Sequence, residues 1–511
     1  EIGVRLVGSE MCIRDSLISI LLLLMVLFLG NYLARDKQDL DDLFALHHTK
    51  ENRSNPVRQS DVEQYMTPLD QELGIPEQKL EYISNALEQN PNLEKTVASI
   101  PTEAAVEDVQ FLFDVLKYSY AGYSYFGTED IWKDCENRII SSIKMHDTDL
   151  TQEELVQILC TNLEFIQDSH FKINYASSVI HSEFYYNDTM EIEEDHSGYY
   201  VKDGNQKWYM KSVEYDENVA DYVKPSLNVE GKICHYLGIL DTRFHSRVNV
   251  VFQSGDQQHE TSIRVSCSEP QVNQNEDAYS CQNIDGIPVI TMERMYKKDS
   301  EDSSVEEFVE SGNIISGQKL AILDLRGNTG GQSWGADAWF QNFTGDSQIP
   351  QVSTLKLSSK IGAYELREIY QTAKEHSLFP PEELLQLEKE ISSIDTTKNQ
   401  WIFTEEKAEK TKNETKLIVL MDGHTASAAE ALISHLNTLE NVVFIGTNTL
   451  GCLLSNANMK CILPHSEIEI SYGDQLYFPE GCTEGKGFEP DIWIGGADTM
   501  ERVLTFLARG K

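Results

Sequence analysis

A short apolar run, followed by a turn of small residues and a helix, constrains this chain most. Leu417–Met421 is entirely apolar and stops at Asp422-Gly423, which predicts a buried strand that ends in a turn. Ser427 follows among small residues, and residues 428–436 carry apolar side chains at helical spacing. A serine at such a strand-to-helix turn lies beside the free N–H groups of the helix start, so it can be presented to a cleft.

The same residues allow a purely structural interpretation. Ser427-Ala-Ala-Glu430 has the spacing of a capping box, and most capping boxes only begin a helix. Glu430 is interpreted as the capping residue. Whether Ser427 is also catalytic therefore depends on other parts of the chain.

Composition limits the class of protein. The chain has 511 residues and 40% hydrophobic content, which is typical of a globular protein with two or three domains. Its 83 acidic and 42 basic residues give a formal net charge of -41. Because phosphate contacts need clustered Lys and Arg, this balance argues against binding to nucleic acid or to anionic membranes.

The N-terminal residues are predicted to be targeting or non-native sequence. Residues 1–16 resemble a translated sequencing adapter and are set aside as an artefact. Residues 17–33 contain the apolar run Leu17–Leu29 and are interpreted as a signal peptide or, by preference, an uncleaved membrane anchor. An extracytoplasmic location, secreted or membrane-anchored, is expected. Residues 34–58 are charged and polar, which predicts a linker.

Three regions follow the linker. Residues 59–170 show helical periodicity and predict a domain of four or five helices. Residues 171–282 predict a small β-rich module, because short alternating runs are separated by turns. The residues from Pro270 to Asp285 are rich in Asn, Gln and Glu and are interpreted as a linker. No carboxylate-binding loop of the kind that captures chain ends is found in the β-rich module.

Residues 283–507 alternate strand and helix patterns and predict an α/β core with at least partly parallel strands. Residues 287–290 and 320–323 are expected strands. A long amphipathic stretch from Tyr364 to Leu387, broken at Pro380-Pro381, is interpreted as a helical excursion over a site.

The cysteines do not indicate a metal site. No C-x-x-C occurs, so zinc ribbons and thioredoxin-like chemistry are unsupported, and neither a metal nor a cofactor is predicted. Cys267–Cys281 and Cys452–Cys461 are the closest candidate disulfides in sequence, whereas Cys135 and Cys160 are expected to be buried thiols.

A glycine pair ends the run Asp324–Gly331, which follows the expected strand at 320–323. One interpretation is a plain turn in which Asp324 and Arg326 form an ion pair. The other is functional, because Gly330 and Gly331 let the backbone approach another group and turn N–H groups toward it.

Four segments occur in an order that resembles the tail-specific (C-terminal-processing) serine peptidase family. They are Asp324–Gly331, Thr425–Glu430, Gly446–Gly451 and Glu484–Asp491. The resemblance covers the α/β region and implies a crotonase-like (Clp protease-like) α/β spiral. It also implies that Ser427 is the nucleophile, and that the backbone N–H groups of Ala428, Gly330 and Gly331 hold the oxyanion.

The chain departs from the Ser–Lys dyad branch of that family. The position of the dyad Lys is occupied by Cys452, and a thiol cannot replace a desolvated amine as the base for a serine. Lys460 and Lys486 remain possible substitutes, although neither stands in the matching position.

The tricorn-core-like branch offers a different base. That branch carries a Ser-His pair at the position of Ser169-His170, and its acid matches Glu484. The resemblance thus implies a tetrad of Ser427 as nucleophile, His170 as base, and Ser169 and Glu484 as polar groups that orient His170. The ordinary histidine pKa near 6.5 suits this task at neutral pH. His424 and His435 are local rivals, interpreted respectively as a loop residue and as a helix residue too distant for contact.

The predicted function is an exported serine endopeptidase that hydrolyses polypeptides through an acyl-enzyme. Unfolded segments or short peptides are the expected substrates. A peptide- or apolar-ligand-binding protein on the same fold is the alternative from another class, and an acyl hydrolase with the same Ser and His is a third. Cleavage specificity and oligomeric state stay open.

Overall fold

The computed structural model describes residues 40–47, 57–66, 97–271, 277–299, 301–376, 379–394, 399–406 and 413–509. Residues 1–16 and 17–33, with the predicted adapter and anchor, lie outside these ranges. Within them, no helix is both long enough and apolar enough to cross a membrane. The fold is mixed α/β.

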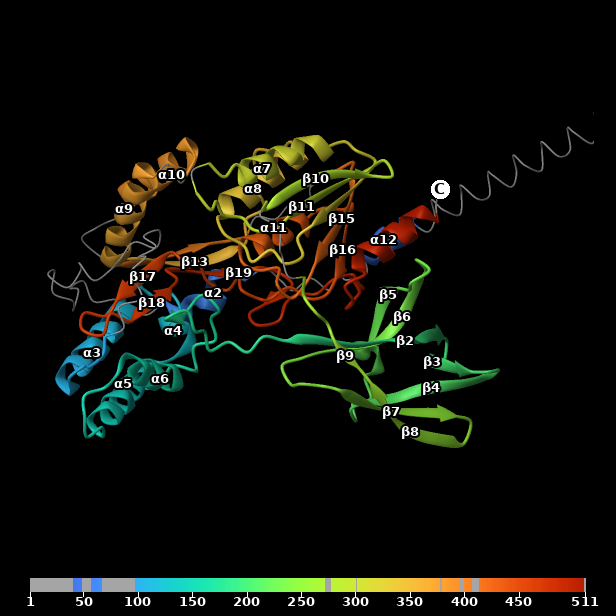
Figure 1. Cartoon of the computed structure of the whole chain (residues 1–511), viewed down its shortest axis with the longest axis horizontal. Coiled ribbons are helices and arrows are strands. Elements are labelled where there is room, and N and C mark those ends of the chain that lie inside the picture. Colours follow the sequence, from blue (N-terminus) through green and yellow to red (C-terminus); the bar gives the residue numbers. More distant parts are fainter. Residues whose placement is uncertain are drawn as a thin grey trace, which may run out of the picture.

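A six-stranded sheet forms the centre of the α/β region (Figure 1). Its strand order is β10-β11-β12-β15-β16-β22, with β11 to β22 parallel and β10 antiparallel. The bounds are β10 Tyr279–Ile284, β11 Ile287–Met292, β12 Leu320–Asp324, β15 Lys416–Met421, β16 Val442–Gly446 and β22 Ile492–Trp493. The predicted strands at 287–290, 320–323 and 417–421 are confirmed as β11, β12 and β15.

Both faces of the parallel part of this sheet are covered, which explains why β11, β12, β15 and β16 are largely apolar. Helices α7 (Ser304–Ile315), α8 (Ser333–Thr344) and α11 (Ala428–Leu436) share one hydrophobic cluster with Leu323 and Val419. Alternate residues of the strands point to the opposite face, where α12 (Thr499–Ala508) packs.

Residues 40–47 differ from the predicted linker, because they are helical and packed on the core. Leu43 and Phe44 are buried in the same cluster as Val503 and Phe506 of α12. Their apolar side chains were too few to register as a helical pattern within a charged stretch.

The predicted linker from Pro270 to Asp285 is wrong for its last part. Residues 279–284 form β10, which pairs with β11 as a hairpin through Asp285-Gly286. The sequence pattern does not predict this strand, because its residues are mostly polar. It is an edge strand that pairs only with β11, and its other side is partly exposed to solvent.

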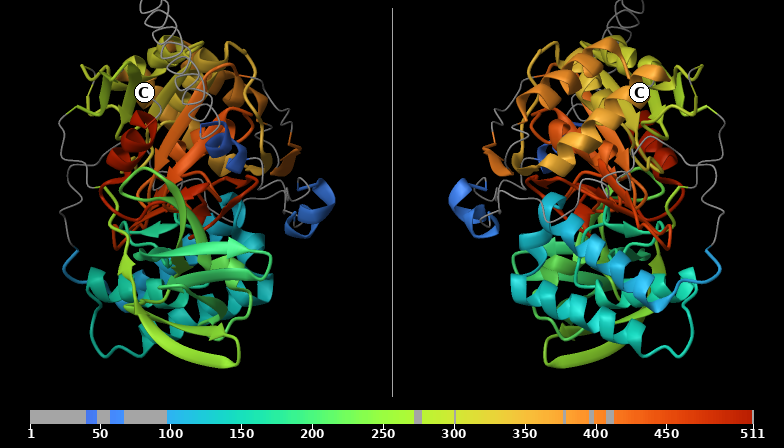
Figure 2. Two further views of the ribbon diagram at one scale, coloured as in Figure 1. Left: turned by 90° about the vertical axis from the view of Figure 1, so that its right-hand side faces the viewer. Right: turned by 90° about the vertical axis from the view of Figure 1, so that its left-hand side faces the viewer.

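The β-rich region forms an antiparallel sheet in the order β5-β6-β2-β3-β4-β7-β8, with β9 beside β2. The strands are β2 Glu183–Asp195, β3 Gly198–Asp203, β4 Gln206–Val213, β5 Val223–Leu227, β6 Ile233–Asp241, β7 Arg247–Ser254, β8 Gln257–Arg264 and β9 Ser266–Cys267, and η3 (Val219–Tyr222) precedes β5. In the side views this sheet and the helices of residues 102–162 lie on the same side of the α/β core (Figure 2).

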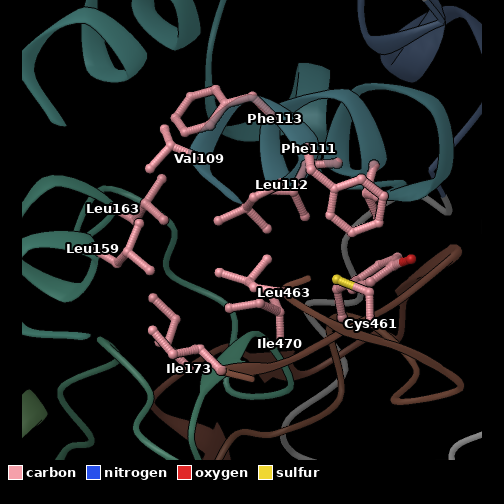
Figure 3. Packing of buried hydrophobic residues seen from close by; sticks show 14 of the residues in the cluster. Val109, Phe111, Leu112, Phe113, Leu159, Leu163, Ile173, Cys461, Leu463 and Ile470 are labelled. Atoms are coloured by element: carbon pink, nitrogen blue, oxygen red, sulfur yellow. The ribbon is translucent and has the colours of Figure 1, made fainter. Parts of the chain in front are cut away.

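The helical region does not close a core of its own. Its elements are α2 Gln59–Val62, η1 Glu63–Tyr65, α3 Thr102–Ser119, α4 Tyr123–Phe126, α5 Glu129–Lys144 and α6 Gln152–Asn162. Leu112 and Leu159 of these helices pack against Leu463 and Ile470 from the other end of the chain (Figure 3). Ile470 belongs to β18 (Glu469–Tyr472), which forms a small sheet with β1 (Lys172–Ile173) and β17 (Met459–Ile462). Leu463 directly follows β17. This packing brings residues near 170 next to the C-terminal loops.

The predicted helical stretch is confirmed as two helices, α9 (Lys360–Glu375) and α10 (Pro381–Ser393), with Pro381 as the first residue of α10. Ile361, Leu366 and Ile369 of α9 join the cluster of α3 and α6. A three-stranded sheet of β14 (Gln400–Thr404), β13 (Ser353–Ser358) and β19 (Gln475–Phe478) lies beside them. A short hairpin of β20 (Cys482–Thr483) and β21 (Gly487–Phe488) completes the C-terminal loops.

Candidate active site

Ser427 occupies a strained position between β15 and α11. Its φ of 53° and ψ of -117° are unusual for a residue other than glycine. The turn is held by Thr425, whose hydroxyl donates to the Leu325 carbonyl at 2.9 Å, and by Asp422, whose carboxylate accepts the Gly327 N–H at 2.9 Å. The loops that follow β12 and β15 are thereby locked together at the carboxyl ends of two parallel strands.

Glu430 does more than cap a helix. Its buried carboxylate accepts the Ser427 N–H at 3.0 Å, the backbone half of a capping box. It also accepts the Thr449 hydroxyl and the N–H groups of Gly451 and Cys452. Burial raises the pKa of Glu430, and these four donors oppose that rise. One carboxylate thus joins the Ser427 turn to the loop at 449–452.

His170 lies directly beside Ser427. Its Nε2 is 3.2 Å from Ser427 Oγ, although the two residues are 257 positions apart. The ring lies in the loop between α6 and β1. Its backbone is held by Asp168, whose carboxylate accepts the His170 N–H at 2.9 Å.

Asp168 is a functional-site residue that sequence reasoning missed as such. It is fully buried, and its carboxylate also accepts the hydroxyls of Ser455 and Tyr120, each at 2.8 Å. Its position directly before Ser169-His170 was the available signal. No local pattern shows, however, that its partners come from residues 120 and 455.

Burial lowers the pKa of His170 below its usual value, and the nearby Asp168 charge opposes the shift. The imidazole is therefore neutral at pH 7. Its Nδ1 is buried and has no hydrogen-bond partner among the residues that the structure describes. A neutral ring with Nε2 unprotonated can accept the Ser427 proton.

Cys452 stands where the dyad branch has its Lys, and its Sγ lies 3.4 Å from the same His170 Nε2. Burial raises the pKa of this thiol well above its usual value, with further contributions from Glu484 and Glu430. A protonated thiol is a poor nucleophile. The two possible substitutes are paired elsewhere: Lys460 with Glu469 at 3.0 Å, and Lys486 with Glu489 at 2.5 Å.

Ser169 and Glu484 are hydrogen-bonded to each other and to the loops next to His170. Glu484 accepts the Ser169 N–H at 2.7 Å with one carboxylate oxygen, and the N–H groups of Leu453 and Leu454 with the other. The Ser169 hydroxyl donates to the Gly451 carbonyl at 3.3 Å. Glu484 therefore fixes the backbone next to His170 and does not touch the imidazole through any hydrogen bond found in the described residues.

Burial raises the pKa of Glu484 to about 7, with Asp168 adding to the rise. Because the folded-state pKa exceeds the usual value of 4.5, this group stabilises the fold at low pH and loses that contribution as pH rises from about 4.5 to about 7. We expect the unfolding free energy to fall between pH 5 and pH 8 by about 2 kcal/mol more in the wild type than in Glu484→Gln. Urea unfolding of both proteins at the two pH values measures this, and equal pH dependence would contradict it.

The three predicted oxyanion donors differ in availability. A Cβ on Gly330 would lie 2.8 Å from Ser427 Cβ and 2.9 Å from Ala428 N, so this glycine packs directly against the serine turn. The Gly330 N–H itself donates to the Asn328 side chain at 2.9 Å. The N–H groups of Gly331 and Ala428 make no hydrogen bond within the described part of the chain. Of the glycine pair, therefore, Gly331 is the one with a donor to offer.

The remaining predicted side chains lie apart from Ser427. His424 is exposed, and its backbone N–H donates to Asp422. His435 Nε2 lies 2.9 Å from Asp337. The ion pair expected between Asp324 and Arg326 is present, with contacts of 2.8 and 2.6 Å.

No disulfide forms among the described cysteines, so the candidate pairs Cys267–Cys281 and Cys452–Cys461 are wrong. Cys461 is buried in the helical cluster and Cys452 faces His170, which separates the second pair. Cys135 is buried and Cys160 partly buried, both as free thiols. Across the described ranges, no group of three or more His, Cys, Asp or Glu side chains could hold a metal ion.

A serine hydroxyl on a strained strand-to-helix turn, within reach of a buried neutral imidazole, defines a site for serine-type hydrolysis. Residues 286–494 match the model of peptidase family S41, and this match supports a serine-type peptidase. The family implies a peptide substrate.

Solved structures that match the chain include mature CPAF complexed with lactacystin, at 12% identity and a TM-score of 0.41, covering 80% of this chain and 98% of that one. The photosystem II D1 C-terminal processing protease matches at 12% identity with a TM-score of 0.34, covering 76% of this chain and 93% of that one. A lipoprotein from Streptococcus agalactiae matches at 12% identity with a TM-score of 0.35, covering 79% of this chain and 96% of that one. No curated protein matches the chain.

Proposed function

We propose that this protein is an extracytoplasmic serine endopeptidase that cleaves polypeptides through an acyl-enzyme on Ser427, with His170 as the base. The observation that carries the proposal is the 3.2 Å separation of His170 Nε2 and Ser427 Oγ. The loss of the dyad Lys, with Cys452 in its place as a neutral thiol, supports a histidine base over a lysine base.

In this mechanism the neutral His170 accepts the Ser427 proton while Oγ attacks the peptide carbonyl. The oxyanion that forms is held by the N–H groups of Ala428 and Gly331. His170 then donates its proton to the leaving amine, and a water activated by the same ring hydrolyses the acyl-enzyme. Each oxyanion donor contributes roughly 3 kcal/mol to transition-state stabilisation.

Ser169, Glu484 and Asp168 are assigned to positioning. Glu484 holds the Ser169 backbone at 2.7 Å and Asp168 holds the His170 backbone at 2.9 Å, so both fix where the ring stands. The arrangement Ser427, His170, Ser169 and Glu484 is that of the tricorn-core-like branch. We therefore assign the chain to this branch, with a crotonase-like spiral as its catalytic core.

The location rests on residues 17–33, which carry the apolar run of an anchor or signal peptide. We propose a membrane-anchored or secreted peptidase that acts on unfolded segments or short peptides. Detecting the native protein in the membrane and periplasmic or external fractions of its source cells would test the location.

A fluorophosphonate probe tests the activity itself. The probe forms a covalent bond with an activated serine, so we expect labelling of the folded wild type, mapped to the peptide that contains Ser427. An unlabelled, folded wild type that binds peptides without cleaving them would contradict the peptidase and favour the binding-protein alternative.

Gly330→Ala is expected to abolish most activity, because the new Cβ would collide with Ser427 and Ala428 at less than 3 Å. Its φ of 86° adds backbone strain of about 1 kcal/mol. Gly317→Ala is the matched control, since Gly317 has a φ of 74° and open space around it. We expect the control to lose similar backbone stability in urea unfolding while keeping its kcat. Equal kcat in the two variants would show that Gly330 does not shape the site.

A further inference from the structure

Two side chains beside Ser427 combine the ligand types that zinc prefers. The Sγ atom of Cys452 lies 3.4 Å from Nε2 of His170. Thiolate sulfur and imidazole nitrogen are the protein ligands most often used for Zn²⁺. Two protein ligands leave two corners of a tetrahedral zinc ion for water or another ligand. The pair therefore differs from a group of three or more His, Cys, Asp or Glu side chains, of which the described ranges contain none.

The separation of the two atoms suits one shared ion. Zinc lies about 2.3 Å from a thiolate sulfur and about 2.0 Å from an imidazole nitrogen, and its ligands stand at tetrahedral angles. These values place the sulfur and the nitrogen roughly 3.5 Å apart. Because the Cys452 and His170 atoms are already 3.4 Å apart, an ion can bind to both without a rearrangement of the backbone.

An ion can approach this pair from the side of the serine. Cys452 and His170 are buried, with 7% and 8% of their surfaces exposed, whereas Ser427 is only partly buried. Ser427 Oγ lies 3.2 Å from the same Nε2 atom. A small ion that reaches the serine hydroxyl therefore stands next to the imidazole nitrogen as well.

The surrounding charges favour a cation. Burial raises the pKa of the Cys452 thiol, and the carboxyl groups of Glu484 and Glu430 raise it further. Asp168 acts in the same direction, and Lys172 acts in the opposite one. The carboxyl groups thus create a negative potential at the sulfur, and this potential attracts a divalent cation. The formal net charge of -41 adds a long-range attraction for cations.

We propose that Cys452 and His170 form an inhibitory zinc site, in which a bound Zn²⁺ ion blocks the serine. On binding, the Cys452 thiol loses its proton to solvent and its sulfur coordinates the ion. His170 coordinates through the Nε2 lone pair, which would otherwise accept the proton of Ser427. Because one lone pair cannot serve both, the zinc-bound enzyme has no base. The inhibition rests on the peptidase function proposed for Ser427, whereas zinc binding does not.

The inhibition is tested by fluorophosphonate labelling of Ser427 at increasing Zn²⁺ concentrations. We expect labelling of the wild type to fall and to return when EDTA removes the ion. Cys452→Ala lacks the sulfur, so half-inhibition should need at least roughly tenfold more Zn²⁺. Mg²⁺ and Ca²⁺ prefer oxygen ligands and should leave the labelling unchanged. Equal zinc sensitivity of the two proteins, or equal inhibition by Mg²⁺, would overturn the site.

Cys267→Ala is the matched control. Its thiol also lies beside a possible zinc ligand, because Cys267 Sγ is 3.3 Å from a carboxylate oxygen of Glu183. It belongs to β9 of the antiparallel sheet. We expect Cys267→Ala to keep the zinc sensitivity of the wild type. Zinc sensitivity that is lost in this variant and kept in Cys452→Ala would assign the inhibition to Cys267 instead. Circular dichroism establishes that both variants are folded.

Direct metal binding separates the zinc site from the peptidase function. Ser427→Ala keeps both ligands, and Co²⁺, which binds the same ligand types as Zn²⁺, reports the sulfur through a thiolate-to-metal absorption band that oxygen and nitrogen ligands lack. We expect this band in Ser427→Ala and its loss when Cys452→Ala is added. A band that does not depend on Cys452, or no band at all in a protein whose wild type is labelled, refutes the zinc site alone. A Cys452-dependent band in a protein whose wild type is not labelled refutes the peptidase and leaves the zinc site standing.

Discussion

Ser427→Ala is expected to lower kcat for peptide hydrolysis by roughly 10⁴- to 10⁶-fold and to abolish fluorophosphonate labelling. The physical reason is that the attacking oxygen is removed, while the turn keeps the hydrogen bonds made by its backbone. The Ser427 N–H still reaches Glu430, and Ala431 N–H still reaches the carbonyl at 427. KM should therefore change little, and steady-state kinetics with a fluorogenic peptide would show the loss in kcat.

Cys452→Ala is the informative control for this experiment, because its thiol is the other nucleophile beside His170 Nε2. Burial keeps that thiol protonated, so we expect Cys452→Ala to retain covalent labelling at Ser427. Labelling that persists in Ser427→Ala and disappears in Cys452→Ala would reverse the assignment of the nucleophile. Circular dichroism and urea unfolding establish that both variants are folded.

His170→Ala is expected to lower kcat/KM by roughly 10³- to 10⁵-fold, since no other base lies within hydrogen-bonding distance of Ser427 Oγ in the described structure. His424→Ala is the matched control: His424 is only three residues from Ser427, but it is exposed. We expect that variant to keep its activity. Full activity in His170→Ala would contradict the histidine base and favour a lysine base.

The pH profile of kcat/KM provides a second readout of His170. The ring accepts the serine proton only when it is neutral, so kcat/KM falls as pH drops through its pKa. Because burial lowers that pKa below 6.5, we expect the acid limb to lie below pH 6.5 with a slope of about one decade per pH unit. A profile that is flat well into the acid range in a folded protein would contradict the histidine base.

Glu484 also titrates in this range, with its pKa raised to about 7, so its contribution must be separated. Glu484→Gln removes that ionisation and leaves the His170 ring in place. We expect the acid limb below pH 6.5 to remain in this variant, although the maximal rate falls because the Ser169 backbone is held less firmly. An acid limb that disappears with Glu484 would assign the titration to the carboxyl group.

Much of the local structure was predictable from sequence. Residues 417–421 and 428–436 form a strand and a helix at the predicted positions, because apolar period and turn chemistry act over a few neighbouring residues. The run at 279–284 was missed for the complementary reason. Its residues are polar, and it becomes a strand only because β11 supplies a hydrogen-bonding partner.

The candidate site was predictable in its members and not in its contacts. Ser427, His170, Ser169 and Glu484 were selected through the resemblance to a peptidase family, and the structure brings all four together. Their catalytic roles stay predictions. The occupied N–H of Gly330, by contrast, depends on the conformation of the Asn328 side chain, which no motif specifies.

The sequence by itself determined the local elements, because these follow from side-chain chemistry and short-range periodicity, and its resemblance to a peptidase family singled out the candidate reactive groups. Only the tertiary structure decided that His170 meets Ser427 across 257 positions. The reason is physical: α3 and α6 cannot bury their apolar faces alone and pack against residues 459–472, and this packing carries His170 to the serine turn. The same packing places the Cys452 thiol beside the ring and the Glu484 carboxylate against the Ser169 backbone.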